Sequence, residues 1–183
     1  FRSSYIVTFP QLVQRIDGIL DKYGHIRDNA SPALAQIRSE LARTEGSVSR
    51  SLNKILHQAQ SEGLVEKDVA PTLRDGRLVI PIVPAMKRKI RGIVHDESAS
   101  GKTVFIEPTE VVEANNRIRE LQADERREII RILTEFTTEM RPHVRFIVAS
   151  YKLLAQVDFI RAKALLANGI GGVKPELLDS PCI

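Results

Sequence analysis

The sequence predicts an α+β fold that is mainly α, with two long antiparallel helices and a small antiparallel β module inserted at their tip. Residues 32–61 and 111–140 each carry one apolar stripe at helical spacing. Residues 74–102 lie between the stripes and are the only part of the chain that alternates like β structure. Because a compact insert returns the chain to its starting point, the two long helices most simply run antiparallel.

The first two helices are predicted from apolar spacing and from their end signals. Residues 10–21 form a short helix. Asn29 or Ser31 can cap the long helix of residues 32–61, whose first residue is a proline. Gly46 lies inside this helix and weakens it by about 0.5–1 kcal/mol relative to alanine. We expect the helix to continue through Gly46.

The module is predicted to contain three short strands, at residues 78–83, 92–95 and 103–106. Pro81 cannot donate a hydrogen bond, which places its strand at a sheet edge or at a bulge. The turn from Asp96 to Lys102 can close a hairpin between the last two strands.

A further helix is predicted after the second long stripe, and with it a division into domains. Residues 143–167 are apolar over most of a helical surface, so this helix is expected in a core. We expect a discontinuous helical domain of residues 1–69 and 109–183 and an inserted β-rich domain of residues 70–108. Since the stripes supply a buried seam of their own, the module is expected to be removable without unfolding the helices.

The excess positive charge of the chain lies in the module. Residues 74–102 hold seven basic and three acidic residues, whereas the rest of the chain balances with 20 of each. A basic β module indicates a polyanionic partner. The candidates for phosphate contact are Lys87, Arg88, Lys89, Arg91 and Lys102, with Arg77 and Arg74 as weaker candidates.

The amino-acid composition of the chain argues against several classes of function. Aromatic residues make up 5% of the chain and Trp is absent, so stacking platforms for single-stranded nucleic acid are scarce. The one cysteine, Cys182, excludes an internal disulfide and suits a reducing compartment. No apolar run is long enough to span a bilayer and no signal peptide is visible, so we expect a cytoplasmic protein without a membrane partner. Because the chain begins with Phe1, we expect it to be part of a longer protein.

No catalytic, cofactor or metal site is predicted. The segment Ser98–Thr103 invites comparison with a phosphate loop, but the position five residues before Gly101 is Asp96, and a strand follows where a helix is needed. A small polar turn is the better interpretation. His95, Asp96 and Glu97 alternate between the two faces of a strand, so they are not expected to converge on a metal ion.

Several runs of residues resemble the type-II branch of the bacterial MutS family. The most specific run is residues 92–108, GIVHDESASGKTVFIEP, within a longer match at residues 74–120. Residues 26–41, 46–56 and 158–177 extend the resemblance over most of the chain, and only the first nine residues fall outside it.

This resemblance implies that the helices are core and lever helices and that the β module is a clamp. It implies a homodimer whose clamps close around duplex or branched DNA or ribosomal RNA. It also implies ATP and Mg²⁺ in a downstream ATPase domain and a C-terminal Smr endonuclease domain, with no cofactor in the present chain. The branch is linked to suppression of homologous recombination and to rescue of collided ribosomes. It lacks the mismatch-reading domain, so mismatch recognition is not expected.

Two functions stay open at this point. In one, the chain is a clamp and lever region that grips nucleic-acid backbone without sequence specificity. In the other, it is a structural coiled-coil arm that docks onto a protein or ribosomal surface, with charge serving to steer the encounter. Salt dependence and competition by DNA distinguish them. In either case we expect this chain alone neither to hydrolyse ATP nor to cut DNA.

Overall fold

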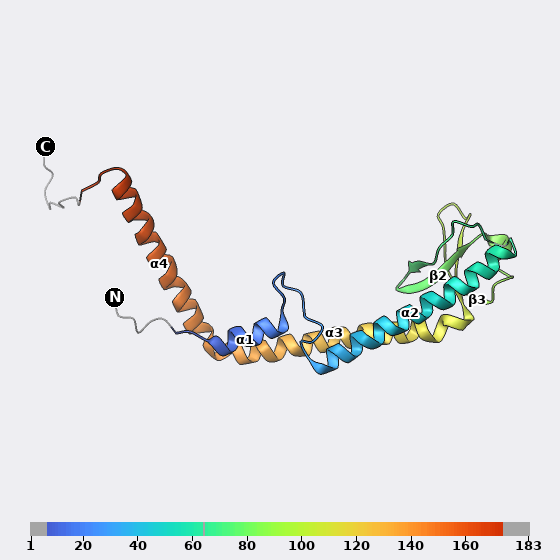
Figure 1. Ribbon diagram of the computed structural model, residues 1–183, viewed down its shortest axis with the longest axis horizontal. Coiled ribbons are helices and arrows are strands. Elements are labelled where there is room, and N and C mark those ends of the chain that lie inside the picture. The colour runs from blue at the N-terminus through green and yellow to red at the C-terminus, as the bar shows by residue number, and fades with distance from the viewer. Residues whose placement is uncertain (1–6, 64, 174–183) are drawn as a thin grey trace. The chain divides into compact units, whose positions relative to one another are not determined.

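The computed structural model describes residues 7–63 and 65–173 and confirms the mainly helical α+β fold (Figure 1). The α-helices in this part are α1 (Pro10–Ile19), α2 (Pro32–Ser61), α3 (Val112–Met140) and α4 (Val144–Gly169). The strands β1 (Thr72–Arg74), β2 (Arg77–Ile82), β3 (Gly92–Glu97) and β4 (Val104–Pro108) form one antiparallel sheet of order β1-β2-β4-β3. The chain divides into two compact units, residues 17–134 and the residues on either side of them. Cys182 lies outside the described residues.

Helix α2 begins and continues as predicted. The Ser31 hydroxyl accepts a hydrogen bond of 3.0 Å from the backbone N–H of Leu34, and Pro32 occupies the first turn, where a missing N–H costs nothing. Gly46 lies within an unbroken helix of 30 residues. Most apolar side chains that follow Gly46 are buried, namely Val48, Leu52, Leu56 and Ala59, and this burial outweighs the low helix propensity of one glycine.

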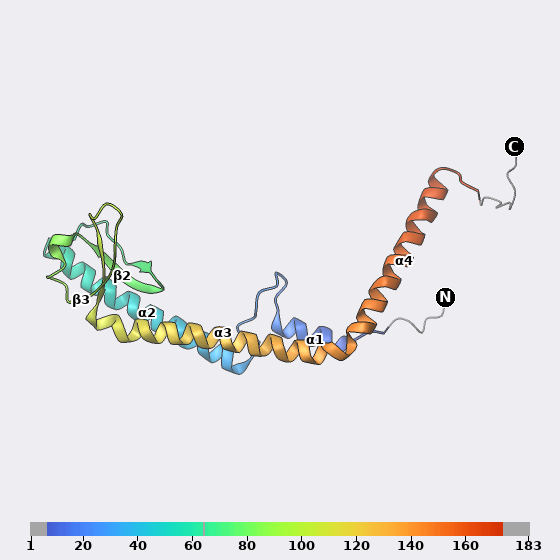
Figure 2. The same cartoon turned by 180° about the vertical axis from the view of Figure 1, so that it is seen from behind.

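Helices α2 and α3 run side by side in opposite directions within residues 17–134 (Figures 1 and 2). Three polar pairs join them: Ser31–Glu128 at 2.6 Å, Arg38–Glu125 at 2.7 Å and Arg117–Glu40 at 2.8 Å. The positions on α3 decrease as those on α2 increase. This order confirms the predicted antiparallel arrangement.

Glu128 is expected to make this helix pair sensitive to acid. Hydrogen bonds from Arg131 and then from Ser31 lower the pKa of Glu128 from its usual 4.5 to about 2, against the opposing effect of burial. Because the folded state favours the carboxylate, ionised Glu128 stabilises the folded protein. This stabilisation is fully present above about pH 4.5 and is lost as the pH falls toward about 2. Urea midpoints measured across this range should fall steeply for the wild type and less steeply for Glu128→Gln. The exposed control Glu97→Gln should follow the wild type, and a wild-type slope in Glu128→Gln would contradict the assignment.

The β module shares one hydrophobic core with the helices. This core joins Val48, Leu52, Leu56 and Ala59 of α2, Ile80, Ile82, Val104 and Ile106 of the sheet, the loop residue Ile90, and Val111 and Ile118 near the start of α3. This shared core contradicts the expectation that the two helical stripes form a buried seam to which the module contributes few contacts. An apolar stripe predicts that one face of a helix is covered, but it does not tell whether a helix or a sheet covers that face. The domain boundaries at residues 70 and 108 stay a prediction.

Strand β1 is an addition to the three strands that the sequence predicts. Turn-forming residues dominate the sequence around β1, and in the structure Asp75 and Gly76 belong to a tight hairpin. Asp75 (φ 48°) and Gly76 (φ 74°) form the two-residue turn between Arg74 and Arg77, which are cross-strand partners. Two positive φ angles match the turn type that a two-residue hairpin requires.

The position of Pro81 differs from the expected edge strand, because β2 lies inside the sheet. The pairing of β2 with β1 nevertheless ends at Val79, and Pro81 pairs only with Phe105 of β4. The missing N–H therefore interrupts no ladder among the described strands. The bulge lies instead in β3, between Val94 and Asp96.

Gly92 is required at the start of β3 by a close approach of the backbone. A Cβ at this position would lie 2.2 Å from the carbonyl oxygen of Glu107 and 2.7 Å from a methyl group of Ile106. We expect Gly92→Ala to lower the free energy of unfolding by about 1–3 kcal/mol, as overpacking does. Gly46→Ala is the control, because its Cβ would meet only Arg50 at 3.5 Å and should stabilise by about 0.5–1 kcal/mol. Equal urea midpoints for the two variants would contradict this geometry.

Helix α4 confirms the last predicted helix but contradicts its expected burial. None of its residues is buried, and the exposed apolar side chains include Val144, Phe146, Ile147, Val148, Leu154, Val157, Phe159, Ile160, Leu165 and Leu166. Within its own unit, α4 lines an apolar groove of about 480 Å³ with Leu12 of α1 and Phe136 of α3. This groove accounts for only one side of a helix that is apolar over most of its surface. None of the described helices has the length and hydropathy needed to cross a membrane.

Candidate nucleic-acid interface

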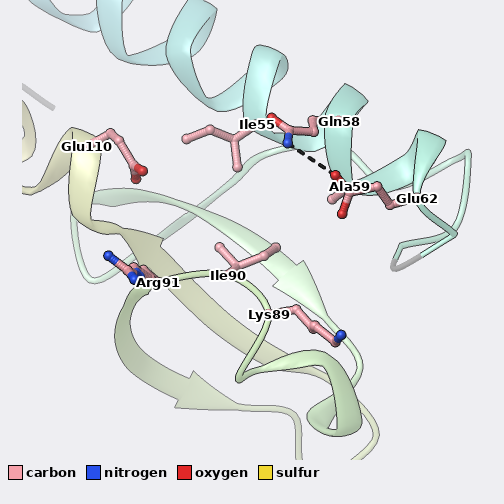
Figure 3. A pocket seen from close by; sticks show the side chains of 8 residues that line it. All are labelled: Ile55, Gln58, Ala59, Glu62, Lys89, Ile90, Arg91 and Glu110. Carbon is pink, nitrogen blue, oxygen red and sulfur yellow. Dashed lines mark hydrogen bonds between the residues drawn. The ribbon is translucent and has the colours of Figure 1, made fainter.

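The basic run, residues 87–91, connects the short 3-10 helix η2 (Pro84–Met86) to β3 and is held by one apolar anchor. The backbone N–H of Lys89 donates to the carbonyl of Met86 at 2.9 Å, which closes a turn. Ile90 is 9% exposed and belongs to the core that α2 and the sheet share. Because the side chain of Ile90 is held in the core, its neighbours Lys89 and Arg91 stay at the surface (Figure 3).

A small cavity of about 260 Å³ lies between the run and α2 (Figure 3). It is lined by Ile55, Gln58, Ala59 and Glu62 of α2, by Lys89, Ile90 and Arg91, and by Glu110 of the 3-10 helix η3 (Thr109–Val111). Gln58 donates a hydrogen bond of 3.1 Å to Glu62. No ion pair joins the two acidic side chains of this lining to Lys89 or Arg91.

Most of the predicted basic residues are exposed and have no carboxylate partner in the described part of the chain. These residues are Arg74, Lys87, Arg88, Lys89, Arg91 and Lys102. Two arginines of the paired helices differ, because Arg38 contacts Asp28 and Glu125, and Arg117 contacts Glu40. A cation without a protein partner can contact a phosphate without first breaking an ion pair.

Arg77 is the exception among the seven candidates. Its guanidinium donates to Glu107 Oε1 at 2.8 Å and to Asn116 Oδ1 at 2.7 Å, and only 15% of the side chain is exposed. A buried carboxylate needs such a partner, because an unpaired buried charge is costly. We therefore leave Arg77 out of the phosphate contacts proposed below.

Glu107 is the centre of a polar network that sequence reasoning missed. Its side chain is fully buried, accepts a hydrogen bond of 2.8 Å from Asn115 Nδ2 and lies 2.6 Å from His95 Nε2. Burial raises the pKa of Glu107, but hydrogen bonds from His95, Asn115 and Arg77, with the charge of Arg77, together lower it below its usual value. The sequence feature that could have indicated this network is an acidic residue, Glu107, inside the otherwise apolar run of residues 104–108.

This network positions the module on the helices. Asn115 of α3 donates to the carbonyl of Leu78 at 3.1 Å and accepts from its N–H at 3.3 Å, which ties α3 to β2. His95 reaches Glu107 from the bulge of β3, where the regular alternation of faces is broken. Asp96 instead accepts from the N–H of Glu97 at 2.8 Å. Within residues 7–63 and 65–173, no group of three His, Cys, Asp or Glu side chains gathers as metal ligands.

The segment Ser98–Thr103 is the predicted polar turn. It joins the antiparallel strands β3 and β4, whereas a phosphate loop joins a strand to a helix. The N–H of Thr103 donates to the Ser98 hydroxyl at 3.0 Å, and Gly101 has a φ of 67°. Lys102 lines a groove of about 670 Å³ together with Met86, the residue before the basic run.

Comparison with known proteins supports the resemblance to the type-II branch of the MutS family. No protein-family model matches the chain. The chain is 42% identical to endonuclease MutS2 of Levilactobacillus brevis over 174 residues, which are 95% of this chain and 22% of that protein. It is 41% identical to endonuclease MutS2 of Geobacillus sp. over 174 residues, which are again 95% of this chain and 22% of that protein. For endonuclease MutS2 of Pelotomaculum thermopropionicum, the identity is 39% over 181 residues, or 99% of this chain and 23% of that protein.

These matches confirm the resemblance predicted from the residues. They span nearly the whole chain, which itself spans less than a quarter of the length of each relative. The chain is therefore similar to one region of endonuclease MutS2.

Proposed function

We propose that this chain, as a region similar to part of endonuclease MutS2, is a clamp carried on lever helices that holds nucleic-acid backbone without sequence or mismatch specificity. The observation that carries the proposal is the exposed basic run with Lys102, whose side chains have no carboxylate partner in the described residues. Such cations attract phosphates of any sequence. The relatives are named endonucleases, which supports a nucleic acid as the polyanion, and DNA and ribosomal RNA are the two candidates.

The proposal for the longer protein follows from the same resemblance. We propose a homodimer whose two clamps close around nucleic acid, with an ATP- and Mg²⁺-dependent ATPase domain and an Smr endonuclease domain outside this chain. We propose that this longer protein acts in suppression of homologous recombination and in rescue of collided ribosomes. The polar pairs between α2 and α3 suit these helices to transmit movement to the clamp. That the present chain alone neither hydrolyses ATP nor cuts DNA stays a prediction.

The alternative function is docking of this arm onto a protein or ribosomal surface. It is favoured by Ile93 and Val94, which are 49% and 39% exposed on β3 at the edge of the sheet. Exposed apolar side chains on an edge strand offer contacts to protein that a nucleic-acid backbone does not use.

Changing Lys87, Arg88, Lys89 and Arg91 together to alanine tests the proposed function. We expect the wild-type chain to bind duplex DNA at about 10⁻⁴–10⁻⁶ M at physiological salt, as non-specific binders do. The variant should bind all sequences more weakly. The slope of log affinity against log salt should fall by about 0.9 for each phosphate that the variant no longer neutralises, or about 3.6 for four phosphates.

A matched variant separates local contact from net charge. Arg43, Arg50 and Lys54 of α2 and Arg119 of α3 are exposed basic residues, and their joint change to alanine removes the same charge. This control should keep most of the affinity and of the salt slope. Unchanged affinity and slope in the variant of the basic run would contradict the clamp proposal and favour protein docking.

A further inference from the structure

Arg74 makes a contact that sets it apart from the other basic residues of the module. From β1 its side chain reaches across β2, and the guanidinium carbon lies 4.1 Å from the ring centre of Phe105 on β4. The other cation–ring contacts of the described residues, Lys22–Tyr23, Arg145–Phe146 and Lys163–Phe159, are local to one segment. The Arg74–Phe105 pair is therefore built by the fold of the sheet.

The charge of Arg74 is not neutralised by this contact. Arg74 and its cross-strand partner Arg77 carry like charges, which repel when they lie opposite each other. Arg77 is neutralised by Glu107, whereas Arg74 has an aromatic ring in place of a carboxylate. No carboxylate of the described residues forms an ion pair with Arg74, so its positive charge is available to an anionic or aromatic ligand.

Arg74 stays exposed although its guanidinium contacts the ring of Phe105. Phe105 is 6% exposed and backs the guanidinium from the sheet, while Arg74 is exposed to solvent. A guanidinium plane is a surface on which nucleobases stack, and cation–ring attraction adds to the stacking. The aromatic side chain beneath holds Arg74 in place, which lowers the entropy cost when a base binds.

We propose that the Arg74–Phe105 pair is a stacking site for one unpaired nucleobase. The basic run contacts phosphates that duplex and single strands both offer, but a continuous duplex keeps its bases stacked inside. The clamp should therefore prefer a strand with an unstacked base. This inference rests on the proposed function and names its substrate class more closely. It also replaces the expectation, drawn from the few aromatic residues, that stacking platforms are scarce.

The test compares a short oligothymidylate with an abasic strand of the same length and charge. Fluorescence anisotropy with the full chain should show tighter binding of oligothymidylate by about 5- to 150-fold, the range expected for stacking one base. Arg74→Lys keeps the charge but removes the planar group, so it should abolish this preference and leave the affinity for the abasic strand unchanged. Phe105→Leu should reduce the preference, and Arg88→Lys, a control in the basic run, should retain it.

The outcomes separate the stacking site from the function on which it rests. Equal wild-type affinities for the two strands, or a preference retained by Arg74→Lys, would overturn the stacking site and leave the phosphate contacts standing. Absence of binding to either strand and to duplex DNA at low salt would overturn both. Because Phe105 is buried, Arg74→Lys decides the matter if Phe105→Leu does not fold.

Discussion

Replacing Glu107 by alanine is expected to lower the free energy of unfolding by about 3–5 kcal/mol, the usual result of breaking a buried ion pair from one side. The change leaves Arg77, with 15% of its side chain exposed, without its carboxylate. It also removes the acceptor of the Asn115 amide and the partner of His95. Urea denaturation followed by circular dichroism measures the destabilisation.

Two further variants make this test specific. Glu110→Ala removes an exposed acid three residues away and should change the free energy of unfolding by no more than about 0.5 kcal/mol. Glu107→Leu combined with Arg77→Met should be more stable than Glu107→Leu alone, because no buried charge is then left unpaired. If Glu107→Ala and Glu110→Ala unfold at the same urea concentration, the network does not hold the module on the helices.

Removal of the β module is expected to abolish cooperative folding of residues 17–134. Replacing residues 70–107 by a short Gly/Ser linker would expose Val48, Leu52 and Leu56 of α2, which the sheet and the start of α3 now bury. Each such side chain contributes about 1.5–3 kcal/mol when buried, so three of them approach the total stability of about 5–15 kcal/mol of an ordinary domain. Hydrogen exchange of the α2 amides should speed up, and the helical circular dichroism signal should weaken.

The alanine variant of the basic run is the control for this deletion. Its four substituted side chains are exposed, so it should melt as cooperatively as the wild type. Retained protection of the α2 amides after the deletion would show that the helices have a sufficient core of their own. That result would uphold the separable domain of residues 70–108 that the sequence predicts.

The helices were predictable from sequence because their signals are local. The cap at Ser31 and the proline beside it lie within one turn of the helix that they start, and the apolar period of α2 and α3 is visible in any short window. The hairpin turn between β3 and β4 was predictable for the same reason. The basic run needed no fold at all, since charge can be counted along the chain.

Other features depend on residues that are far apart in the chain. The partners Arg77 and Glu107 are separated by a strand, a loop and a second hairpin, and His95 meets Glu107 only when β3 and β4 pair. No local window contains these pairs. The contact of Arg74 with Phe105 likewise requires the strand order, which local patterns do not determine.

The sequence by itself determined the number and kind of the main helices, the place of the inserted β module, its positive charge and its likeness to the type-II branch of the MutS family. The tertiary structure decided what each apolar surface meets and which charges remain free. The part of the α2 stripe from Val48 to Ala59 packs against the sheet as well as the start of α3, α4 is left largely uncovered in its unit, and Arg77 pairs with Glu107 while Arg74 has no ion-pair partner among the described residues. The apolar periodicity of a helix predicts that one of its faces will be buried. Only the packing of segments that are distant in the chain determines which segment covers that face.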